Sequence, residues 1–267
     1  MEAAAVKEAR IPEFQEHRLY DIQNDLWYAL HDIITPSSDS PNSIDLVGMM
    51  GFSTPEGFLG HYIEDTGGLH IAHELVELKQ HHEPSYNHSL RTGLFSWAGM
   101  RYLSDQDKLD LREKKPLFCL SGLGHDILKL GVPAEVLDKP GALTDDERII
   151  MDSHVSPDSV EFIVRDHYMK GDGFDKKQMD YMTDLIAGHH PGKGLKSING
   201  HAELITIADH MDAAMFRGGY QKKVSPEVFL EYIGRQLSEG AFKDKYAEPF
   251  RLMLEEYSRG GAEDGNQ

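Results

Sequence analysis

A histidine and an aspartate directly follow the apolar run 116–124, and this pair constrains the fold more than any other feature of the chain. The run is typical of a buried segment, whereas a carboxylate is seldom buried without a partner. His125 and Asp126 therefore need polar partners inside the protein. A neighbouring side chain could satisfy an isolated pair. Imidazole and carboxylate are also metal ligands, however, and a carboxylate can bridge two ions.

More histidines and carboxylates of the same kind occur along the chain, and together they favour the metal interpretation. They lie on or beside segments with helical apolar stripes: His88, His154, His189, His190 and Asp209. Each of them alone could be an ordinary core or surface residue. A site that combines imidazole with carboxylate suits Mn, Fe, Ni or Zn better than Mg or Ca. The sequence therefore predicts a buried cluster of ligands for transition-metal ions.

Apolar residues recur at helical spacing through most of the chain, and no segment shows the alternation typical of a strand. The pattern predicts an all-α protein. The expected helical segments are 1–34, 68–80, 81–103, 115–128, 144–154, 179–190 and 203–216, with a short helix and loop within 43–60. Thr144 and Glu147 have the spacing of a capping box, so a helix is expected to begin there. Ile150 and Met151 are expected to bury one face of that helix.

The chain divides, on this pattern, into an accessory helical region at 1–80, a main domain at 81–259 and a disordered tail at 260–267. Within the first region, His70 and His73 share a helix face with nearby acidic residues. Such a group could hold a metal, but a solvated helix face explains it better because no further ligand is implied.

Composition limits the partners and the compartment. The net charge of −18 argues against binding a nucleic-acid duplex, which requires a basic surface, so an anionic substrate needs local cations or bound metal. No apolar run has the length of a membrane span, and the first residues lack the layout of a secretory signal. Cys119 is the only cysteine and fits a small core position. We expect a cytoplasmic protein with no membrane partner.

The order of these motifs resembles the HD superfamily of metal-dependent phosphohydrolases, and most closely its HD-GYP branch. The stretch HDILKLGVPAEVLDKPGALTDDERIIMDSH is similar to that branch's HDIGK, IP, IL, KPG, LT, E and H pattern at nearly the same spacing. IADHMDAAMFRGGY is similar to its IAD, DA, R and Y segment. The resemblance covers about residues 81–250.

The resemblance implies an HD-domain helical bundle with a binuclear centre of two divalent ions, with Fe or Mn expected and Ni, Co or Zn left open. It assigns one ion to His88, His125, Asp126 and Asp209. It assigns the other to Asp126, His154, His189 and His190, so that Asp126 bridges. Lys129 would contact the scissile phosphate or the attacking water. The cations and tyrosine expected near the substrate are Arg91, Lys193, Lys196, Arg217 and Tyr220.

Members of this branch hydrolyse cyclic di-GMP or related cyclic dinucleotides in bacterial signalling, so the implied activity is that of a phosphodiesterase. The chain departs from the branch in lacking the Gly-Tyr-Pro triplet, because a shorter loop beginning PGKG follows the histidine doublet. Position 84 is Pro where members with three metals have Glu, which favours two ions. Another HD-type nucleotide or phosphomonoester hydrolase stays open, as do a catalytically weak cyclic-dinucleotide sensor or interaction module and a homodimeric assembly.

Overall fold

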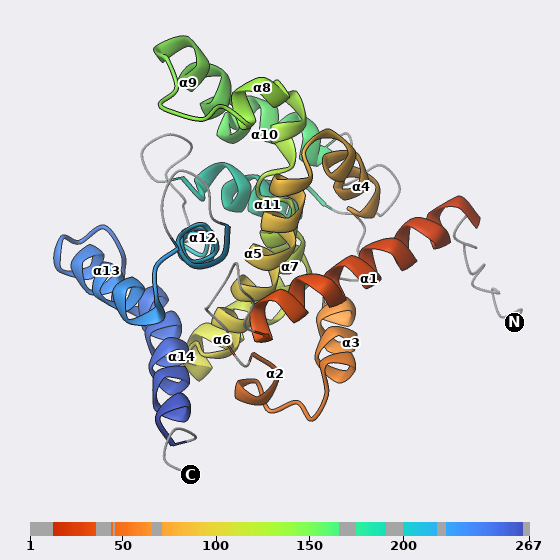
Figure 1. Cartoon of the computed structure of the whole chain (residues 1–267). Helices are drawn as coiled ribbons and strands as arrows, with labels where there is room; N and C mark the ends of the chain where they lie inside the picture. Colours follow the sequence, from red (N-terminus) through yellow and green to blue (C-terminus); the bar gives the residue numbers. More distant parts are fainter. Residues whose placement is uncertain are drawn as a thin grey trace, which may run out of the picture.

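The structure is a computed structural model, and every element in the part of the chain that it describes is helical (Figure 1). This confirms the all-α prediction. The described residues are 13–35, 44, 46–65, 71–165, 175–190, 200–217 and 223–263. Within these ranges, the side chains of residues 13–20, 49, 72, 109, 110, 217 and 256–263 are not described.

Helix α5 (Glu83–Arg101) runs through the middle of the protein and packs between α7 (Lys115–Gly124) and α12 (Ala202–Asp212) (Figure 1). Its apolar side chains, among them Leu90, Leu94 and Trp97, are fully buried. Small residues bring α5 and α7 close together. A Cβ atom added at Gly122 would lie 3.6 Å from the Cα atom of Gly93.

The first four helices belong to the same hydrophobic core as the rest of the chain. They are α1 (Glu13–Ile34), α2 (Leu46–Met49), α3 (Pro55–Asp65) and α4 (Ala72–His81). Helix α1 packs on α4 and α5, and its buried Ile22, Leu26 and Leu30 lie in one cluster with Trp97. The core is therefore continuous across the boundary predicted between residues 80 and 81.

The later helices pack on the central helices α5, α7 and α12 or on one another. They are α11 (Lys176–Gly188), a π-helical segment η4 (Ala213–Arg217), α13 (Pro226–Ser238) and α14 (Asp244–Glu263). Helix α14 packs on α5, α12 and α13, and its ring of Phe250 lies against Gly99. The tail predicted at 260–267 overlaps the last four residues of α14, and its remaining residues lie outside the described ones.

The helix predicted at 115–128 ends earlier in the structure than the sequence suggests. Helix α7 ends at Gly124, His125 and Asp126 form a turn, and a 3-10 helix η1 (Ile127–Gly131) follows. Asp126 has φ −102° and ψ 8°, which is outside the α-helical region and explains the break. The histidine–aspartate pair is therefore held in a turn.

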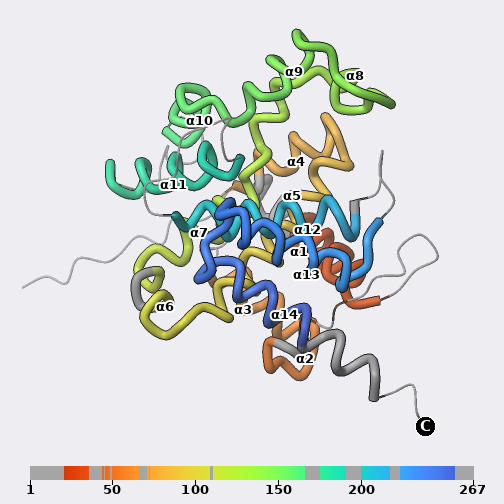
Figure 2. The backbone as a smooth tube through the Cα atoms, turned by 90° about the vertical axis from the view of Figure 1, so that its left-hand side faces the viewer, coloured from red at the N-terminus to blue at the C-terminus, as the bar shows by residue number. Residues whose placement is uncertain are grey.

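A lobe at one end of the molecule carries four short elements: α8 (Ala134–Leu137), α9 (Asp145–Asp152), the 3-10 helix η2 (Ser153–Val155) and α10 (Pro157–Ile163). Both views place α8 and α9 far from α2 and α14 (Figures 1 and 2). The capping box of Thr144 and Glu147 is confirmed. The predicted burial of Ile150 and Met151 is wrong, because α9 packs mainly on α8 and η2 and no residue of it is buried. The side chain of Ile150 is 39% exposed.

We expect Gly93→Ala to destabilise the protein by about 1–3 kcal/mol, since the interior has no room for another methyl group. The new Cβ would lie 2.5 Å from the Tyr62 hydroxyl oxygen and 2.8 Å from Leu123 Cδ2. Chemical denaturation measures the change. Gly60→Ala in α3 is the control, because nothing lies within 4 Å of the added Cβ, and it should stabilise α3 by about 0.5–1 kcal/mol. Equal stabilities for both variants would contradict the close α5–α7 packing.

The remaining short element is α6 (Asp105–Arg112), which links α5 to α7. Ser104 caps it by accepting a hydrogen bond from the backbone N–H of Asp107 at 3.2 Å. Because α6 turns the chain around, α5 and α7 run side by side in opposite directions. His88 near the start of α5 and His125 after the end of α7 therefore meet at the same end of this helix pair.

Candidate metal centre

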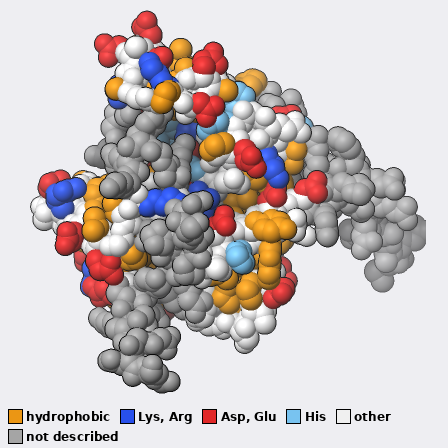
Figure 3. Space-filling view, viewed as in Figure 1, with side chains coloured by type: hydrophobic (Ala, Val, Ile, Leu, Met, Phe, Trp, Pro, Cys, Tyr) orange, Lys and Arg blue, Asp and Glu red, His pale blue; other side chains and the backbone are white. Residues whose placement is uncertain are grey.

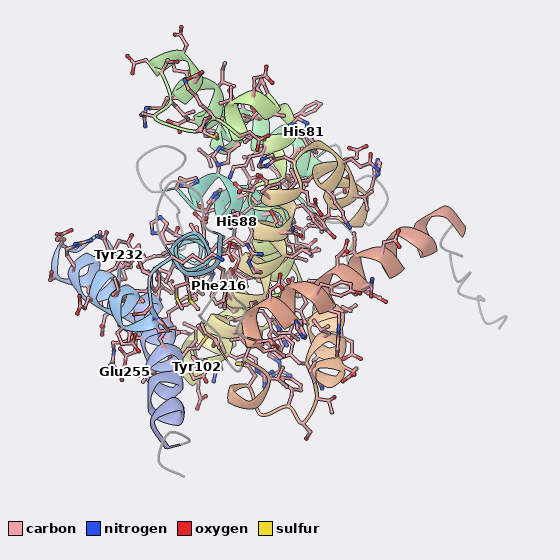
Figure 4. All side chains as sticks on the ribbon, viewed as in Figure 1. His81, His88, Tyr102, Phe216, Tyr232 and Glu255 are labelled. Carbon is pink, nitrogen blue, oxygen red and sulfur yellow. The ribbon has the colours of Figure 1, made fainter. Side chains whose placement is uncertain are left out.

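The seven predicted ligands lie together inside the protein, although they come from five different segments. His88 comes from α5 and Asp209 from α12, while the others follow the ends of α7, α9 and α11. Figure 4 labels His88, which lies where α5, α11 and α12 approach one another. The ligand atoms form three overlapping groups: His88 with His125 and Asp209, His125 with Asp126 and His189, and His154 with His189 and His190.

The first group surrounds the Nε2 atom of His88. This atom lies 3.0 Å from Asp209 Oδ1, 3.3 Å from His125 Nε2 and 3.5 Å from Asp126 Oδ2. His125 Nε2 is also 3.5 Å from Asp126 Oδ2. Two imidazole nitrogens and two carboxylate oxygens therefore face one small volume, which is a donor set that suits a transition-metal ion.

The second of the two groups that could each hold an ion, His154 with His189 and His190, lies on the other side of the Asp126 carboxylate. His154 Nε2 is 3.4 Å from Asp126 Oδ1, and the rings of His154 and His190 are 5.1 Å apart between centroids. The rings of His189 and His190 are 4.3 Å apart. One oxygen of Asp126 thus faces the first group and the other faces the second. This is the placement required of a carboxylate that bridges two ions.

Three polar atoms at the meeting point of the two groups are buried and accept or donate no hydrogen bond within the described part of the chain. They are Asp126 Oδ1, His154 Nε2 and His189 Nε2. An unsatisfied buried polar group costs about 1–3 kcal/mol, so three of them side by side are unfavourable unless something binds them. Metal coordination would satisfy all three, and the residues present therefore fit a metal centre.

Helix ends orient three of the imidazole rings. His125 Nδ1 lies 3.0 Å from the carbonyl oxygen of Gly122, three residues before it. In the same way, His154 Nδ1 lies 2.5 Å from the carbonyl oxygen of Met151, and His189 Nδ1 lies 2.6 Å from that of Ile186. The last carbonyls of a helix have no partner within the helix, so they can accept from these rings. If Nδ1 carries the proton, the Nε2 lone pair is free to bind metal.

His88 is oriented by a side chain instead. Its Nδ1 lies 2.6 Å from Asp212 Oδ2, and Arg91 donates from Nε to Asp212 Oδ1 at 2.5 Å and from Nη2 to Asp212 Oδ2 at 3.2 Å. All three side chains are buried. Asp212 was not predicted as a functional residue. The available signal is its position three residues after Asp209, which places both carboxylates on one face of α12.

The pKa shifts favour the protonation states that metal ligands require. Burial lowers the pKa of both His125 and His154 to about 4, and burial together with His190 lowers that of His189. Burial alone would raise the pKa of Asp126, but Lys129 and the surrounding imidazoles hold it well below its usual range. At neutral pH the rings are therefore neutral and the carboxylate is charged, as metal binding needs.

Lys129, on η1, donates a hydrogen bond to Asp126 Oδ2 and is almost fully buried. Arg91 lies beside the first group, where Asp212 accepts from it. The other predicted substrate contacts cannot be placed: Lys193, Lys196 and Tyr220 lie outside the described residues, as does the side chain of Arg217. Figure 3 shows histidine side chains beside and below the lobe that carries α8 and α9.

The second histidine group considered in the sequence is only partly described. His70 lies outside the described residues. His73 Nε2 is 3.3 Å from Glu77 Oε1, and both side chains are about half exposed. This exposed pair within one turn of α4 agrees with a solvated helix face. Cys119 is buried in the core, as predicted.

The chain matches no model of a known protein family and no curated protein. Within its described residues, it also contains no helix that is both long and apolar enough to cross a membrane.

We expect Asp212→Ala to weaken metal binding by about 10–100-fold, because the ring of His88 loses the carboxylate that orients it. Asp212→Asn keeps a hydrogen-bond acceptor and should retain more affinity. Competition with a fluorescent chelator measures both. Asp184→Ala, which removes another buried aspartate from the neighbouring α11, is the control. Metal affinity unchanged in both Asp212 variants would show that His88 does not need this partner.

Lowering the pH from 7 to 5 should destabilise the metal-free protein. His125 and His154 have a pKa near 4 when folded and near 6.5 when unfolded, so the unfolded chain binds more protons between these values. The free energy of unfolding is therefore highest above pH 6.5 and decreases as the pH falls from 6.5 towards 4. At pH 5 the loss is on the order of 2 kcal/mol for each histidine. Thermal unfolding in the presence of chelator measures it. His154→Leu should weaken the dependence of the unfolding temperature on pH, whereas the control His73→Ala should leave it unchanged. An unfolding temperature that does not depend on pH would contradict the lowered pKa values of His125 and His154.

Proposed function

We propose that the chain is an HD-type, metal-dependent phosphodiesterase with two ions, Fe or Mn, that hydrolyses cyclic di-GMP or a related cyclic dinucleotide. One observation carries the proposal. The buried carboxylate of Asp126 directs one oxygen to each of two imidazole groups, and three buried atoms at that place have no hydrogen-bond partner among the described residues.

The arrangement of ligands supports two ions rather than one. His88, His125 and Asp209 would hold one ion, and His154, His189 and His190 the other, with Asp126 shared between them. When bound, two neighbouring divalent ions lower the pKa of a water molecule and neutralise the charge that develops on a phosphoryl oxygen. The helical fold and the order of these residues along the chain agree with an HD-domain bundle.

Lys129 supports a phosphate-ester substrate. Its ammonium group is held next to Asp126 by a hydrogen bond, with little exposure to water. A buried cation at this place can donate to a phosphoryl oxygen and stabilise the added charge in the transition state. The protein carries a net charge of −18, so an anionic substrate has to be attracted locally, by this lysine and the ions.

The preference for a cyclic dinucleotide comes from the resemblance of residues 125–154 and 207–220 to the HD-GYP branch. The loop that replaces the Gly-Tyr-Pro triplet lies outside the described residues. Because this loop is short and rich in glycine, we expect it to hold the second base of a dinucleotide less firmly. Hydrolysis of cyclic di-GMP would then be slow or relaxed in base preference, with a linear dinucleotide accumulating.

The test combines metal analysis with a substrate panel. Protein purified without chelator is analysed for transition metals and incubated with cyclic di-GMP, other cyclic dinucleotides, nucleoside monophosphates and a generic phosphodiester. We expect two ions for each chain. We also expect cleavage of a cyclic dinucleotide to its linear form, which chromatography of the reaction mixture detects. Cleavage of monophosphates alone would favour another HD-type phosphohydrolase. Inertness with both ions bound would favour a sensor, and failure to take up Mn or Fe would refute the metal centre.

A further inference from the structure

A second hollow lies at the other end of α5 and α7 from the metal centre. Its volume is about 550 Å³, and it is formed by the end of α5, one side of α6 and the start of α7. Four cationic side chains line it: Arg101, Lys108, Arg112 and Lys115. The only acidic side chain that lines it, among the described residues, is Asp105. In a chain with 45 acidic and 27 basic residues, such a concentration of cations is unusual.

Two of the four cations have no carboxylate partner among the described side chains. Lys115 pairs with Asp65 at 2.7 Å, and Lys108 lies 3.9 Å from Asp105. Arg112, by contrast, makes no ion pair with a described carboxylate. Arg101 lies over the rings of Phe52 and Trp97, at 5.5 Å and 5.2 Å from their centroids.

The contact with the two rings holds the guanidinium of Arg101 in place without using its charge on a carboxylate. Its N–H groups therefore stay available to a planar anion such as a phosphate, which arginine binds through paired hydrogen bonds. Lys108 and Arg112 are four residues apart on α6 and lie on the same face. Cations from three helices thus face one hollow, which makes an anion the complementary ligand.

The hollow also has an apolar part. Met100 and Leu111, which line it, are 5% and 1% exposed and belong to the hydrophobic core. Small-molecule sites commonly have volumes of about 300–1,000 Å³ and combine apolar walls with a few polar groups. An inorganic anion would leave most of this space unfilled. A ligand with both an anionic group and a flat aromatic ring, such as a nucleoside monophosphate, fits the size and the chemistry better.

This hollow is distinct from the metal centre. His88 and Arg101 are 13 residues apart on one helix, which corresponds to about 20 Å along α5. Helix α7 joins the same two places, since Lys115 lies at its start and His125 follows its end. A ligand in the hollow would therefore contact both central helices without reaching the candidate metal ligands.

We propose that this cationic hollow is a second ligand site, which binds a phosphate-bearing molecule the size of a mononucleotide. The proposal does not depend on the hydrolytic activity of the metal centre, because it rests on different residues. Arg101, Lys108 and Arg112 would recognise the phosphate of the ligand, and Met100 and Leu111 would contact the face of its aromatic ring.

The test uses AMP and inorganic phosphate as probes, titrated calorimetrically into the full-length, metal-loaded protein. The cavity variant is Lys108→Glu with Arg112→Glu, both on exposed positions of α6. The matched control is Lys176→Glu with Lys177→Glu on the exposed surface of α11, which changes the net charge equally. We expect AMP to bind the parent protein. Its affinity for the cavity variant should be at least about tenfold lower, and its affinity for the control variant should lie within about twofold of that for the parent protein. Inorganic phosphate should bind more weakly than AMP.

Circular dichroism and metal content of each variant show whether it is folded and whether its metal centre is intact. Affinity for AMP that is equal in the parent and a folded cavity variant would overturn the proposal and place the nucleotide elsewhere, such as at the metal centre. An equal loss in the control would show general charge attraction instead of a site. No binding of AMP to the parent protein would also overturn it, and equal affinities for AMP and phosphate would refute the mononucleotide-sized ligand.

Discussion

Replacing Asp126 with alanine should remove both metal ions of the proposed centre and abolish the proposed hydrolysis. One oxygen of this carboxylate faces His88 and His125 and the other faces His154, so each ion loses a charged ligand at once. Removing it also leaves the buried ammonium of Lys129 without its partner. Loss of a partner from a buried ion pair costs about 3–5 kcal/mol, so the unfolding temperature should fall as well. Elemental analysis and activity assays measure the first two effects, and thermal unfolding measures the third.

His154→Ala separates the two ions. His154 belongs only to the second group, so this variant should retain about one ion for each chain while Asp126→Ala retains neither. His201→Ala is the matched control, because His201 is another buried histidine, but its ring contacts Tyr181 and Tyr246 outside the cluster. It should keep both ions. Two ions retained in Asp126→Ala would contradict a bridging role for this carboxylate.

Lys129→Ala should lower turnover by about 10²–10³-fold while changing metal content little, because in the proposed function the lysine stabilises charge on the phosphate and is not a ligand. The measurement pairs kcat for the best substrate of the panel with elemental analysis of the same sample. Lys139→Ala is the control. Lys139 also pairs with a carboxylate, that of Glu147, but it lies on the lobe outside the cluster. Unchanged turnover in Lys129→Ala would show that the lysine only neutralises Asp126.

The seven candidate ligands could be predicted as a set, because several follow local patterns and their order along the chain resembles that of a known family. His125 and Asp126 follow an apolar run, and His189 ends a helix whose Met182 and Leu185 are buried. Periodicity reports which face of a helix is buried, and that was enough to place these residues inside. The pairing of Asp126 with both groups depends on where separate helices cross, which no local pattern contains, so this expectation came from the family resemblance alone.

The errors have physical causes of the same kind. The apolar residues of α9 suggested a buried face, but Ile150 is partly exposed because α9 stands on the lobe away from the core. Asp212 was passed over because its partners, His88 and Arg91, are more than 120 residues away along the chain. The break after Gly124 was missed because the apolar spacing of Leu123 and Ile127 continues across it, although the residues at the break are poor helix formers. The tertiary contacts of the turn decide its backbone.

Three histidines obtain their orientation from backbone carbonyls, and this affects how the site can vary between related sequences. The residues that supply those carbonyls, Gly122, Met151 and Ile186, have unrelated side chains. At Met151 and Ile186, any residue that keeps the helix end in place and fits the packing there would supply the same carbonyl. Gly122 is constrained further, because an added Cβ would lie 3.3 Å from the Cβ atom of Ser96. His88 depends instead on a particular side chain, that of Asp212. In related sequences we therefore expect residues 88 and 212 to vary together. For the other three histidines, the damaging change would be the insertion or deletion of a residue between the histidine and the carbonyl that orients it.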